Sequence, residues 1–239
     1  MTLVYLDEHN PIFPDSCDAI DDPDGLLAFG GNLAPETLLD AYRKGIFPWY
    51  QDGDPIMWWS PSARCILRLD KFHVSKSLRR LIRKNIHSIT FNRAFKEVLR
   101  GCSAPRDNQA GGTWITNDMY EAYSKLHTLG FAHSLEVWSN GFLVGGLYGV
   151  AVNRVFSGES MFSKTANASK LALYALCHQL RLANFTGIDC QMPTDHLLRL
   201  GAEVISRDTF LKILGSREDI CLKWDTPWQN CSDISRSCL

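Results

Sequence analysis

Short runs of β-branched and aromatic residues alternate with amphipathic segments along most of the chain after residue 87. Asn140 and Gly141 lie between two long apolar runs, which is the pattern of a β-hairpin. Asn92 is expected to cap the first helix of this region and Gly101 to end it. The order of elements predicts a sheet that is antiparallel in its hairpins and mixed later, with helices packed on it. Strands are predicted at 88–91, 132–138, 142–152, 155–162, 187–191 and 202–206, and helices at 93–100, 117–127, 168–184, 194–200 and 207–214.

The pattern of the first 87 residues is less regular. A short strand is predicted at 3–6, a clear helix at 34–45 and a further strand at 64–69. Pro35 suits the first turn of that helix because a proline has no N–H to leave unsatisfied. We therefore predict two domains, a small N-terminal α/β domain at residues 1–87 and a larger domain at residues 88–239.

The distribution of charge adds a feature that the hydropathy pattern does not show. The chain has 25 Lys and Arg against 26 Asp and Glu, yet no acidic residue lies between Asp70 and Glu97. Ser75 is placed to cap a helix in this stretch, and the basic residues of that helix recur on one stripe. A solvated helix face is the simple interpretation, but like charges at i, i+4 repel each other, so a phosphate partner is favoured. The stripe consists of Lys76, Arg79, Arg80, Arg83 and Lys84.

Composition excludes several classes of protein. With 45% hydrophobic residues, 17 glycines and 10 prolines, the chain is neither collagen nor disordered. No run approaches the ~18 apolar residues of a membrane-spanning helix, and the first residues lack the pattern of a secretory signal. A soluble cytoplasmic protein is expected. The eight cysteines lack zinc-ligand spacing, so they are interpreted as apolar filler and surface thiols, and no metal is expected.

Polar side chains at the end of the strand 187–191 are one candidate for chemistry. Asp189 and Gln191 would share one face of this strand, and Cys190 would take the other, so Cys190 is expected in the core and not as a nucleophile. The pair could orient an amine and accept its proton. Alternatively, Asp189 binds backbone amides in the turn before the next helix. Spacing alone leaves the two interpretations even.

Glu159 is a second candidate because it lies in an otherwise apolar strand. A β-bulge at Gly158 would bring Glu159 and Phe156 to one side, where a carboxylate near Met161 suits an apolar side chain next to a positive amine. The alternative is a solvent-facing carboxylate on an edge strand. Other aromatic residues are candidates for exposed stacking surfaces or for a cleft wall, although each alone is more often ordinary core. They are Trp49, Trp114 and Tyr123.

Motifs for nucleotide cofactors are missing from the sequence. N-acetyltransferases with this order of elements hold the pyrophosphate of acetyl-CoA in a Gly-rich loop that opens the long helix. The corresponding sequence here, SKTANASK, has no glycine. There is also no GxxxxGK[ST] loop and no GxSxG elbow. An acetyl-CoA-dependent enzyme is therefore disfavoured, and a non-catalytic RNA-binding protein that uses the basic stripe is a further alternative.

Several unusual strings occur together and in order: DGLLAFGGNL, AYRKGIFPWY, MWWSP, GTWIT, LVGGLYGV, FSGESMFS, NASK and IDCQ. From about residue 3 to residue 210, the chain resembles the leucyl/phenylalanyl-tRNA–protein transferases. The resemblance implies an α+β fold, with a small N-terminal α/β domain packed on a GNAT-like (N-acetyltransferase-fold) C-terminal domain with a mixed sheet. It also implies a monomeric cytoplasmic aminoacyltransferase without a metal or a dissociable cofactor. Such an enzyme moves leucine, phenylalanine or, less well, methionine from aminoacyl-tRNA to proteins that begin with Arg or Lys, and thereby creates a degradation signal.

The resemblance also assigns roles to residues at matching positions. It implies that Asp189, Gln191 and Glu159 are catalytic. The substrate-binding residues that it implies are Trp49, Trp114, Tyr123, Leu147, Phe156 and Met161. The tRNA-binding residues that it implies are Lys76, Arg80, Arg83 and Lys84. The chain departs from the family pattern in a longer segment before GTWIT and at Arg199, where a small residue is usual.

A mechanism follows from the chemistry of the implied substrates. Aminoacyl-tRNA is an activated ester, so its aminolysis needs no ATP. A protein α-amine has a pKa of about 7.7–8.0, so a modest base is enough to free it for attack. The hypothesis is that Asp189 and Gln191 orient this amine and draw off its proton, while Glu159 holds the amine of the donor residue or helps to fix the acceptor.

Overall fold

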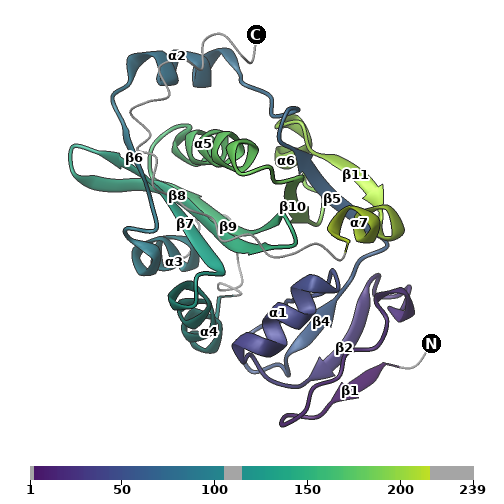
Figure 1. The fold of residues 1–239 in the computed structure, drawn as a ribbon. Helices are drawn as coiled ribbons and strands as arrows, with labels where there is room; N and C mark the ends of the chain where they lie inside the picture. The colour runs from purple at the N-terminus through teal and green to yellow at the C-terminus, as the bar shows by residue number, and fades with distance from the viewer. Residues whose placement is uncertain (1–2, 105–114, 216–239) are drawn as a thin grey trace.

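The computed structural model describes residues 3–104 and 115–215. Within these residues the strands form two sheets, a small one near the N-terminus and a larger one that carries most of the helices (Figure 1). The small sheet has the order β1-β2-β4-β3, in which β1 and β2 are parallel and the other pairs antiparallel. Its part of the chain contains β1 (Val4–Leu6), η1 (Ser16–Asp18), β2 (Leu26–Gly30), α1 (Pro35–Arg43), β3 (Phe47–Pro48) and β4 (Met57–Trp59).

Helix α1 forms because its apolar residues recur on one side. Pro35 occupies the first turn, as predicted. Leu38, Ala41 and Tyr42 are buried, and they belong to the same hydrophobic core as Trp58 of the small sheet. Because this core also includes residues of α4 (Asn117–Thr128), α1 joins the small sheet to the rest of the molecule.

The larger sheet has the order β11-β5-β10-β9-β8-β7-β6. Its strand pairs are antiparallel except for β9 and β10, which run parallel. The α+β class with a mixed sheet is therefore confirmed. The strands are β5 (Ala63–Arg68), β6 (Ser88–Phe91), β7 (Ala132–Ser139), β8 (Phe142–Val152), β9 (Val155–Ser163), β10 (Gly187–Gln191) and β11 (Glu203–Ser206).

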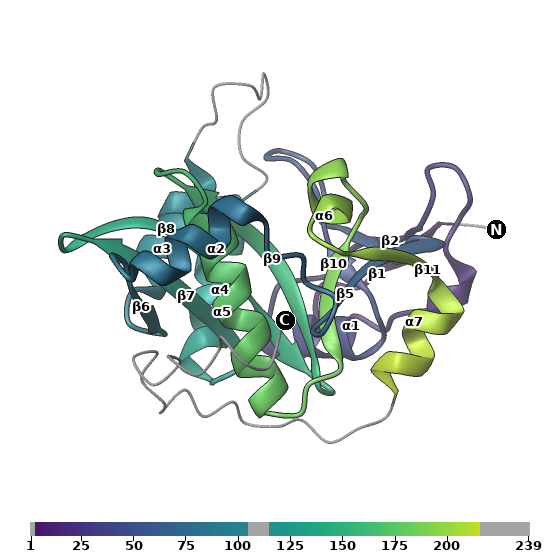
Figure 2. The same cartoon turned by 90° about the horizontal axis from the view of Figure 1, so that it is seen from above.

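Helices cover both faces of the larger sheet (Figure 1). Side chains alternate along a strand, so Leu147 of β8 packs with α5 on one face and Tyr148 packs with α3 and α4 on the other. Figure 2 shows α2 lying over α5 on the outside of the first of these layers. The helices other than α1 and α4 are α2 (Lys76–Lys84), α3 (Phe95–Ser103), α5 (Ala168–Leu182), α6 (Asp195–Arg199) and α7 (Arg207–Leu214).

Helix α3 differs from its prediction at both ends. Asn92 does not cap it: the helix begins at Phe95 after Ala94, and the side chain of Asn92 instead accepts a hydrogen bond from the Ser134 amide at 3.0 Å. The helix also continues through Gly101, which was expected to end it. A Cβ at Gly101 would lie 2.7 Å from the ring of Phe162, so this glycine serves the close packing of the helix on β9.

The two sheets divide the chain between β4 and β5, whereas the sequence places the domain boundary near residue 87. β5 lies inside the larger sheet, where it pairs with β10 and β11. Its alternate residues Cys65 and Leu67 are fully buried and pack in the core beneath α5. The segment 63–84 therefore lies with the larger sheet, because two strand partners and the α5 layer hold it there.

The cysteines and the surface agree with a protein built around an apolar core. Cys65, Cys102 and Cys177 are buried and Cys17 is exposed, as expected for filler and a surface thiol.

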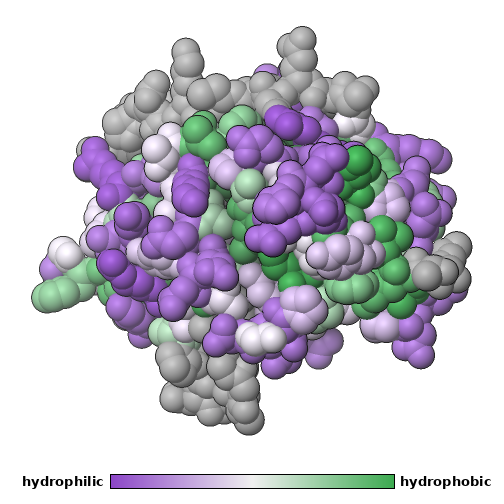
Figure 3. Space-filling view, turned by 90° about the horizontal axis from the view of Figure 1, so that it is seen from below, coloured by the Kyte–Doolittle hydropathy of each residue, from purple (hydrophilic) through white to green (hydrophobic). Residues whose placement is uncertain are grey.

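Seen from below, the molecule shows mostly hydrophilic side chains, with hydrophobic ones gathered near the centre and toward one side (Figure 3). Among the described residues, no helix is long and apolar enough to cross a membrane, and no group of His, Cys, Asp and Glu is placed to hold a metal ion.

Candidate active site

A small apolar cavity lies between β9, β10 and α5. Its volume is about 160 Å³. The three residues implied for an amino-acid pocket, Leu147, Phe156 and Met161, all line it, so the fold brings them together. We call this cavity the side-chain pocket. Its lining consists of Leu147, Tyr148, Phe156, Gly158, Glu159, Ser160, Met161, Leu173, Leu176, Ile188, Cys190, Gln191 and Leu197.

A β-bulge in β9 turns Glu159 toward the side-chain pocket. β8 pairs Tyr148 with Ser160 and then Gly149 with Gly158, so Glu159 is the extra residue. The bulge lies immediately after Gly158, and both Phe156 and Glu159 line the pocket, as the bulge prediction requires. The half-buried Glu159 thus faces an apolar cavity.

Three polar side chains from different elements converge on Glu159. The hydroxyl of Tyr42, from α1, donates to Glu159 Oε1 at 2.8 Å, and that of Tyr123, from α4, donates to Oε2 at 3.1 Å. Gln191 Nε2, at the end of β10, donates to Oε1 at 3.0 Å. Tyr123 is fully buried, so of the alternatives that the sequence leaves open for it, the structure excludes an exposed stacking surface and favours the core. Its hydroxyl faces Glu159 because the ring packs in the core between α4 and β8.

Burial and hydrogen bonding act on Glu159 in opposite directions. The two tyrosine hydroxyls lie 2.5 Å apart, so three contacts join Tyr42, Tyr123 and Glu159 in a ring. The hydrogen bonds from Tyr42 and Tyr123 favour the ionised carboxylate and lower its pKa, whereas burial favours the protonated form and is the larger effect. Burial raises the pKa of Glu159 to about 7, and it raises the pKa of both tyrosines well above 10.

Asp189 faces Arg64 and not the side-chain pocket. Arg64 Nε and Nη2 donate to the two carboxylate oxygens at 2.8 and 2.7 Å, and both side chains are almost fully buried. The guanidinium also donates to Gly45 O at 3.2 Å and lies between the rings of Phe47 and Phe210. With both oxygens held by Arg64, Asp189 is committed to a buried ion pair.

The strand alternation that the sequence predicts ends at Asp189. The register of β10 on β5 shifts between Asp189 and Gln191, and Gln191 has φ 61°. Asp189 Oδ1 accepts from the Gln191 amide at 2.9 Å, which is the turn-binding alternative, while the Gln191 side chain swings to Glu159. Asp189 and Gln191 are thus linked through the backbone but point to different partners.

Cys190 is half-buried: it packs against the core that includes α5, as predicted, and it also lines the side-chain pocket. The neighbouring Cys65 thiol and burial raise the pKa of Cys190 well above its ordinary value. A nucleophilic cysteine needs a lowered pKa, so the surroundings of Cys190 disfavour that role.

Trp49 is the most exposed of the aromatic candidates that the structure describes. Its side chain is 43% accessible, and its ring packs edge-on against Trp59 with the centroids 5.6 Å apart. The backbone carbonyl of Trp49 accepts from the Trp59 indole at 2.7 Å, which fixes this segment. Trp114 lies outside the described residues. Trp49 therefore remains available as a stacking surface.

The predicted basic stripe forms on α2. Ser75 caps the helix through a hydrogen bond from the Leu78 amide at 3.2 Å, as predicted. Leu78 is fully buried, and Leu81 and Ile82 pack against the core that includes α5. The opposite side of the helix carries a cationic surface, because its basic residues are all exposed. They are Lys76, Arg79, Arg80, Arg83 and Lys84.

Two residues of the candidate site, Tyr42 and Arg64, were not found from the sequence. Nothing local in the sequence indicates that the hydroxyl of Tyr42 reaches Glu159 of β9. Arg64 opens the apolar segment RCILRL, and a cation in a central strand is a signal that it has a buried partner. This signal can be read from the sequence, but the identity of the partner, Asp189, cannot, because it lies 125 positions away.

The protein is therefore of the α+β class. Its candidate site is a side-chain pocket with the carboxyl group of Glu159 in its lining, and the basic helix α2 lies on the surface of the molecule. A family model for leucyl/phenylalanyl-tRNA protein transferase matches residues 66–215, and one for the N-terminal domain of the same transferase matches residues 31–62. The chain therefore belongs to the leucyl/phenylalanyl-tRNA–protein transferase family.

Sequence relatives agree with the family models. A leucyl/phenylalanyl-tRNA–protein transferase of Pseudomonas fluorescens (strain Pf0-1) is 52% identical over 217 residues, which are 91% of this chain and 96% of the relative. That of Psychromonas ingrahamii is 50% identical over 231 residues, covering 94% of this chain and 96% of the relative. Among solved structures, the chain is similar to FemX with a TM-score of 0.47 and 11% identity, over 72% of this chain and 66% of that one.

Proposed function

We propose that this protein transfers leucine, phenylalanine and, less well, methionine from aminoacyl-tRNA to the α-amine of proteins that begin with Arg or Lys. The product would be a destabilising N-terminus, and we place the reaction in the cytoplasm, catalysed by a monomer without a metal or a cofactor. Family membership supports the donor and the reaction type. The observation that carries the proposal in this chain is the side-chain pocket with Glu159 and Gln191 at one end.

The reaction is the aminolysis of an ester. The nitrogen of the acceptor amine attacks the carbonyl carbon of the aminoacyl ester, and a new C–N bond forms. The bond from this carbon to the ribose oxygen then breaks, the amine loses a proton and the ribose oxygen gains one. Positioning the two substrates supplies most of the rate, because the ester is already activated.

Glu159 is the group we assign to the proton transfer. A general base is most effective when its pKa lies near the working pH, and burial gives Glu159 a pKa of about 7. In its ionised form the same carboxylate attracts the positive amine of the donor residue. The hydroxyls of Tyr42 and Tyr123 hold the Glu159 carboxyl group in place, and the side-chain amide of Gln191 donates to the same carboxyl group.

We do not assign to Asp189 the role of proton acceptor that the sequence-based hypothesis gives it. Because Arg64 holds both carboxylate oxygens, we assign Asp189 to positioning. It accepts a hydrogen bond from the Gln191 amide and so fixes the end of β10, from which the Gln191 side chain reaches Glu159. Loss of Asp189 should therefore disturb the site through Gln191.

The side-chain pocket supports the proposed choice of donor. Its volume of about 160 Å³ compares with the roughly 150 Å³ of an apolar cavity that binds benzene, the size of a phenylalanine ring. Leu147, Phe156 and Met161 form its apolar wall. We propose that this wall admits side chains that are not branched at Cβ, such as those of leucine and phenylalanine. Discrimination against Ile and Val rests on one misplaced methyl group, which is worth about 1–3 kcal/mol.

We assign the exposed cations of α2 to the acceptor stem of the tRNA, and Trp49 and Trp114 to the nucleoside or the cleft wall. Lys76, Arg80, Arg83 and Lys84 provide charges for phosphates on one exposed face. Tyr123 belongs to the Glu159 cluster and would act on the substrates only through that carboxyl group.

A transfer assay tests the proposal directly. Labelled Leu-tRNA is mixed with peptides that begin with Lys, Arg or Ala, and labelled peptide is measured. We expect label on the Lys and Arg peptides and little on the Ala peptide. If tRNA binds and no peptide is labelled, the protein is an RNA-binding adaptor. If the protein releases thiol from acetyl-CoA in the presence of an amine, it is an N-acetyltransferase.

A further inference from the structure

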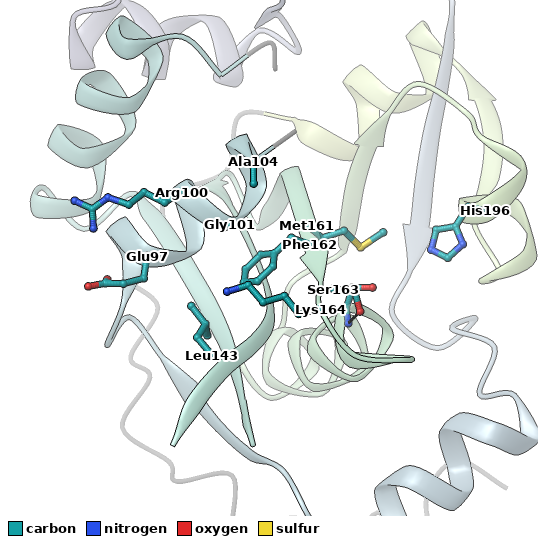
Figure 4. A pocket seen from close by; sticks show the side chains of 11 residues that line it. Glu97, Arg100, Gly101, Ala104, Leu143, Met161, Phe162, Ser163, Lys164 and His196 are labelled. Carbon is teal, nitrogen blue, oxygen red and sulfur yellow. Dashed lines mark hydrogen bonds between the residues drawn. The ribbon is translucent and has the colours of Figure 1, made fainter. Parts of the chain in front are cut away.

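A second, larger pocket lies beside the side-chain pocket. It has a volume of about 740 Å³ and is bounded by α3, β9, the start of α5 and α6 (Figure 4). Met161 lines both pockets, so the two adjoin each other at this side chain. Figure 4 shows Met161 between Phe162 and His196, with Glu97 and Arg100 at the other end. We call this space the outer pocket.

The outer pocket combines an aromatic surface with an excess of positive charge. Lys164 Nζ lies 5.8 Å from the centroid of the Phe162 ring, so a cation stands over an aromatic face that lines the pocket. Arg100 also lines the pocket, but its guanidinium lies over the Tyr120 ring of α4, 5.9 Å from the ring centroid. Glu97 is the only carboxylate among the described lining residues. Burial and the nearby charges of Lys170 and Arg199 lower the pKa of His196, which favours its neutral form.

We propose that the outer pocket binds the single-stranded 3′ end of the donor RNA, with Lys164 on a phosphodiester and a base against Phe162. The proposal rests on the function proposed above. When the aminoacyl group occupies the side-chain pocket, its ribose lies at that pocket's edge, and the preceding nucleotides must leave from there. The outer pocket begins directly beyond Met161 and has the size of small-molecule sites, about 300–1,000 Å³.

The charges favour RNA over the acceptor peptide as the occupant. An acceptor that begins with Arg or Lys carries two positive charges at its end, which Lys164 would repel. A phosphodiester carries the opposite charge, and bases stack on aromatic rings with little sequence preference. Single-stranded RNA is therefore the ligand whose chemistry fits Lys164 and Phe162 together.

The outer pocket and the cationic surface of α2 both lie next to α5. Leu81 and Ile82 of α2 pack on the core that contains α5, and Ser169 in the first turn of α5 lines the outer pocket. Figure 2 shows α2 lying over α5. Helix α5 thus separates a basic outer surface from a basic pocket, so a tRNA whose stem lies on α2 can direct its single strand past α5 toward Met161.

The variant Lys164→Gln and two donors test this assignment. One donor is Phe-tRNA, and the other is phenylalanyl-adenosine, which carries the same ester without any phosphate. We expect the KM for Phe-tRNA to rise about tenfold, as for the loss of a charged hydrogen bond. We expect the KM for phenylalanyl-adenosine to stay within twofold of the wild type. The salt dependence of RNA binding should also weaken by about 0.7 in log–log slope for one phosphate of a single strand. Lys212→Gln, at an exposed lysine of α7, is the matched control.

Each other outcome has a defined meaning. If Lys164→Gln behaves like Lys212→Gln with both donors, the outer pocket does not hold the RNA. An equal loss with both donors also overturns the assignment, since it shows that Lys164 maintains shape and does not bind phosphate. A raised KM for the peptide alone assigns the pocket to the acceptor. If the wild type labels no peptide from either donor, the proposed function itself fails, which is a different result.

Discussion

Gln191 Nε2 lies 3.0 Å from Glu159 Oε1, and this contact spans the point where β9 and β10 separate. The two parallel strands pair as far as Ser157 and Asp189, and the bulge and the left-handed backbone of Gln191 then turn their side chains toward each other. The side-chain pocket lies beneath this contact. Parallel strands that diverge next to a long helix thus create both the cavity and the polar group at its end.

The first prediction concerns the proton transfer. Glu159→Gln should lower turnover at saturating substrate by about 100-fold or more, because general base catalysis contributes about 10²–10⁴-fold. The wild-type rate should rise as the pH rises through about 7, where Glu159 loses its proton. That part of the profile should vanish in the variant and leave only the titration of the acceptor amine. Glu121→Gln, at an exposed carboxylate of α4, serves as control. A variant that keeps the step near pH 7 would exclude Glu159 as the base.

The second prediction concerns stability. The folded protein holds the Glu159 proton up to a pH of about 7, whereas the unfolded chain releases it near the ordinary value of 4.5. The unfolded state binds fewer protons between these values, so the free energy of unfolding should fall as the pH rises from 4.5 to 7. One pKa unit corresponds to about 1.4 kcal/mol. Urea unfolding of the wild type and Glu159→Gln at several pH values isolates this contribution as their difference. Parallel curves would show that Glu159 has the same pKa in both states.

The third prediction concerns the buried ion pair. Arg64→Met leaves the Asp189 carboxylate buried without its partner, which should lower the free energy of unfolding by about 3–5 kcal/mol. Arg64→Met combined with Asp189→Leu should lose less than Arg64→Met alone, because no charge is then stranded. The exposed pair of Arg68 and Glu203 provides the control, and Arg68→Met should cost less than about 1 kcal/mol. Urea unfolding measures all three. Equal losses at Arg64 and Arg68 would contradict the role given to burial.

The fourth prediction concerns the choice of donor. Met161→Ala enlarges the side-chain pocket at its edge, so it should reduce the preference for Leu-tRNA over Ile-tRNA by about tenfold or more. The measurement is the ratio of kcat/KM for the two donors. Met192→Ala, at an exposed methionine, should leave this ratio unchanged. Identical ratios in Met161→Ala and the wild type would remove Met161 from the specificity pocket.

The fifth prediction concerns RNA binding by α2. Replacement of Lys76, Arg80, Arg83 and Lys84 by Gln should weaken tRNA binding and flatten its salt dependence. Each lost phosphate contact should reduce the log–log slope by about 0.7–0.9. Binding at several salt concentrations measures this slope. Lys125→Gln with Lys212→Gln removes exposed charges from other helices and should change the slope little. An unchanged slope in the quadruple variant would exclude α2 as the RNA-binding surface.

Local features of the site could be predicted from the sequence, because they depend on neighbouring residues. Ser75 caps α2 as its position before a basic, amphipathic segment indicates. Gly158 marks the bulge that turns Glu159, since a glycine in an apolar strand has little else to contribute. The hairpin at Asn140 and Gly141 follows from the left-handed backbone that this pair adopts readily.

Partners from distant parts of the chain could not be predicted. Strand alternation placed Asp189 and Gln191 on one face, but it could not show that Arg64 of β5 would hold Asp189. The register shift after Asp189 arises only when β10 is paired with β5, so it leaves no local trace. Tyr123 has the residue type of an exposed stacking platform, and only its packing beneath β8 shows that it is buried.

Tyr42 emerges from the ribosome long before Glu159, because 117 positions separate the two. Gln191 follows later still, at the end of β10. The carboxyl group therefore acquires its hydrogen-bond partners only once most of the polypeptide has been synthesised and α1 has docked on the larger sheet. A nascent chain that ends before β10 lacks Gln191 and with it one of the hydrogen bonds that hold the Glu159 carboxyl group.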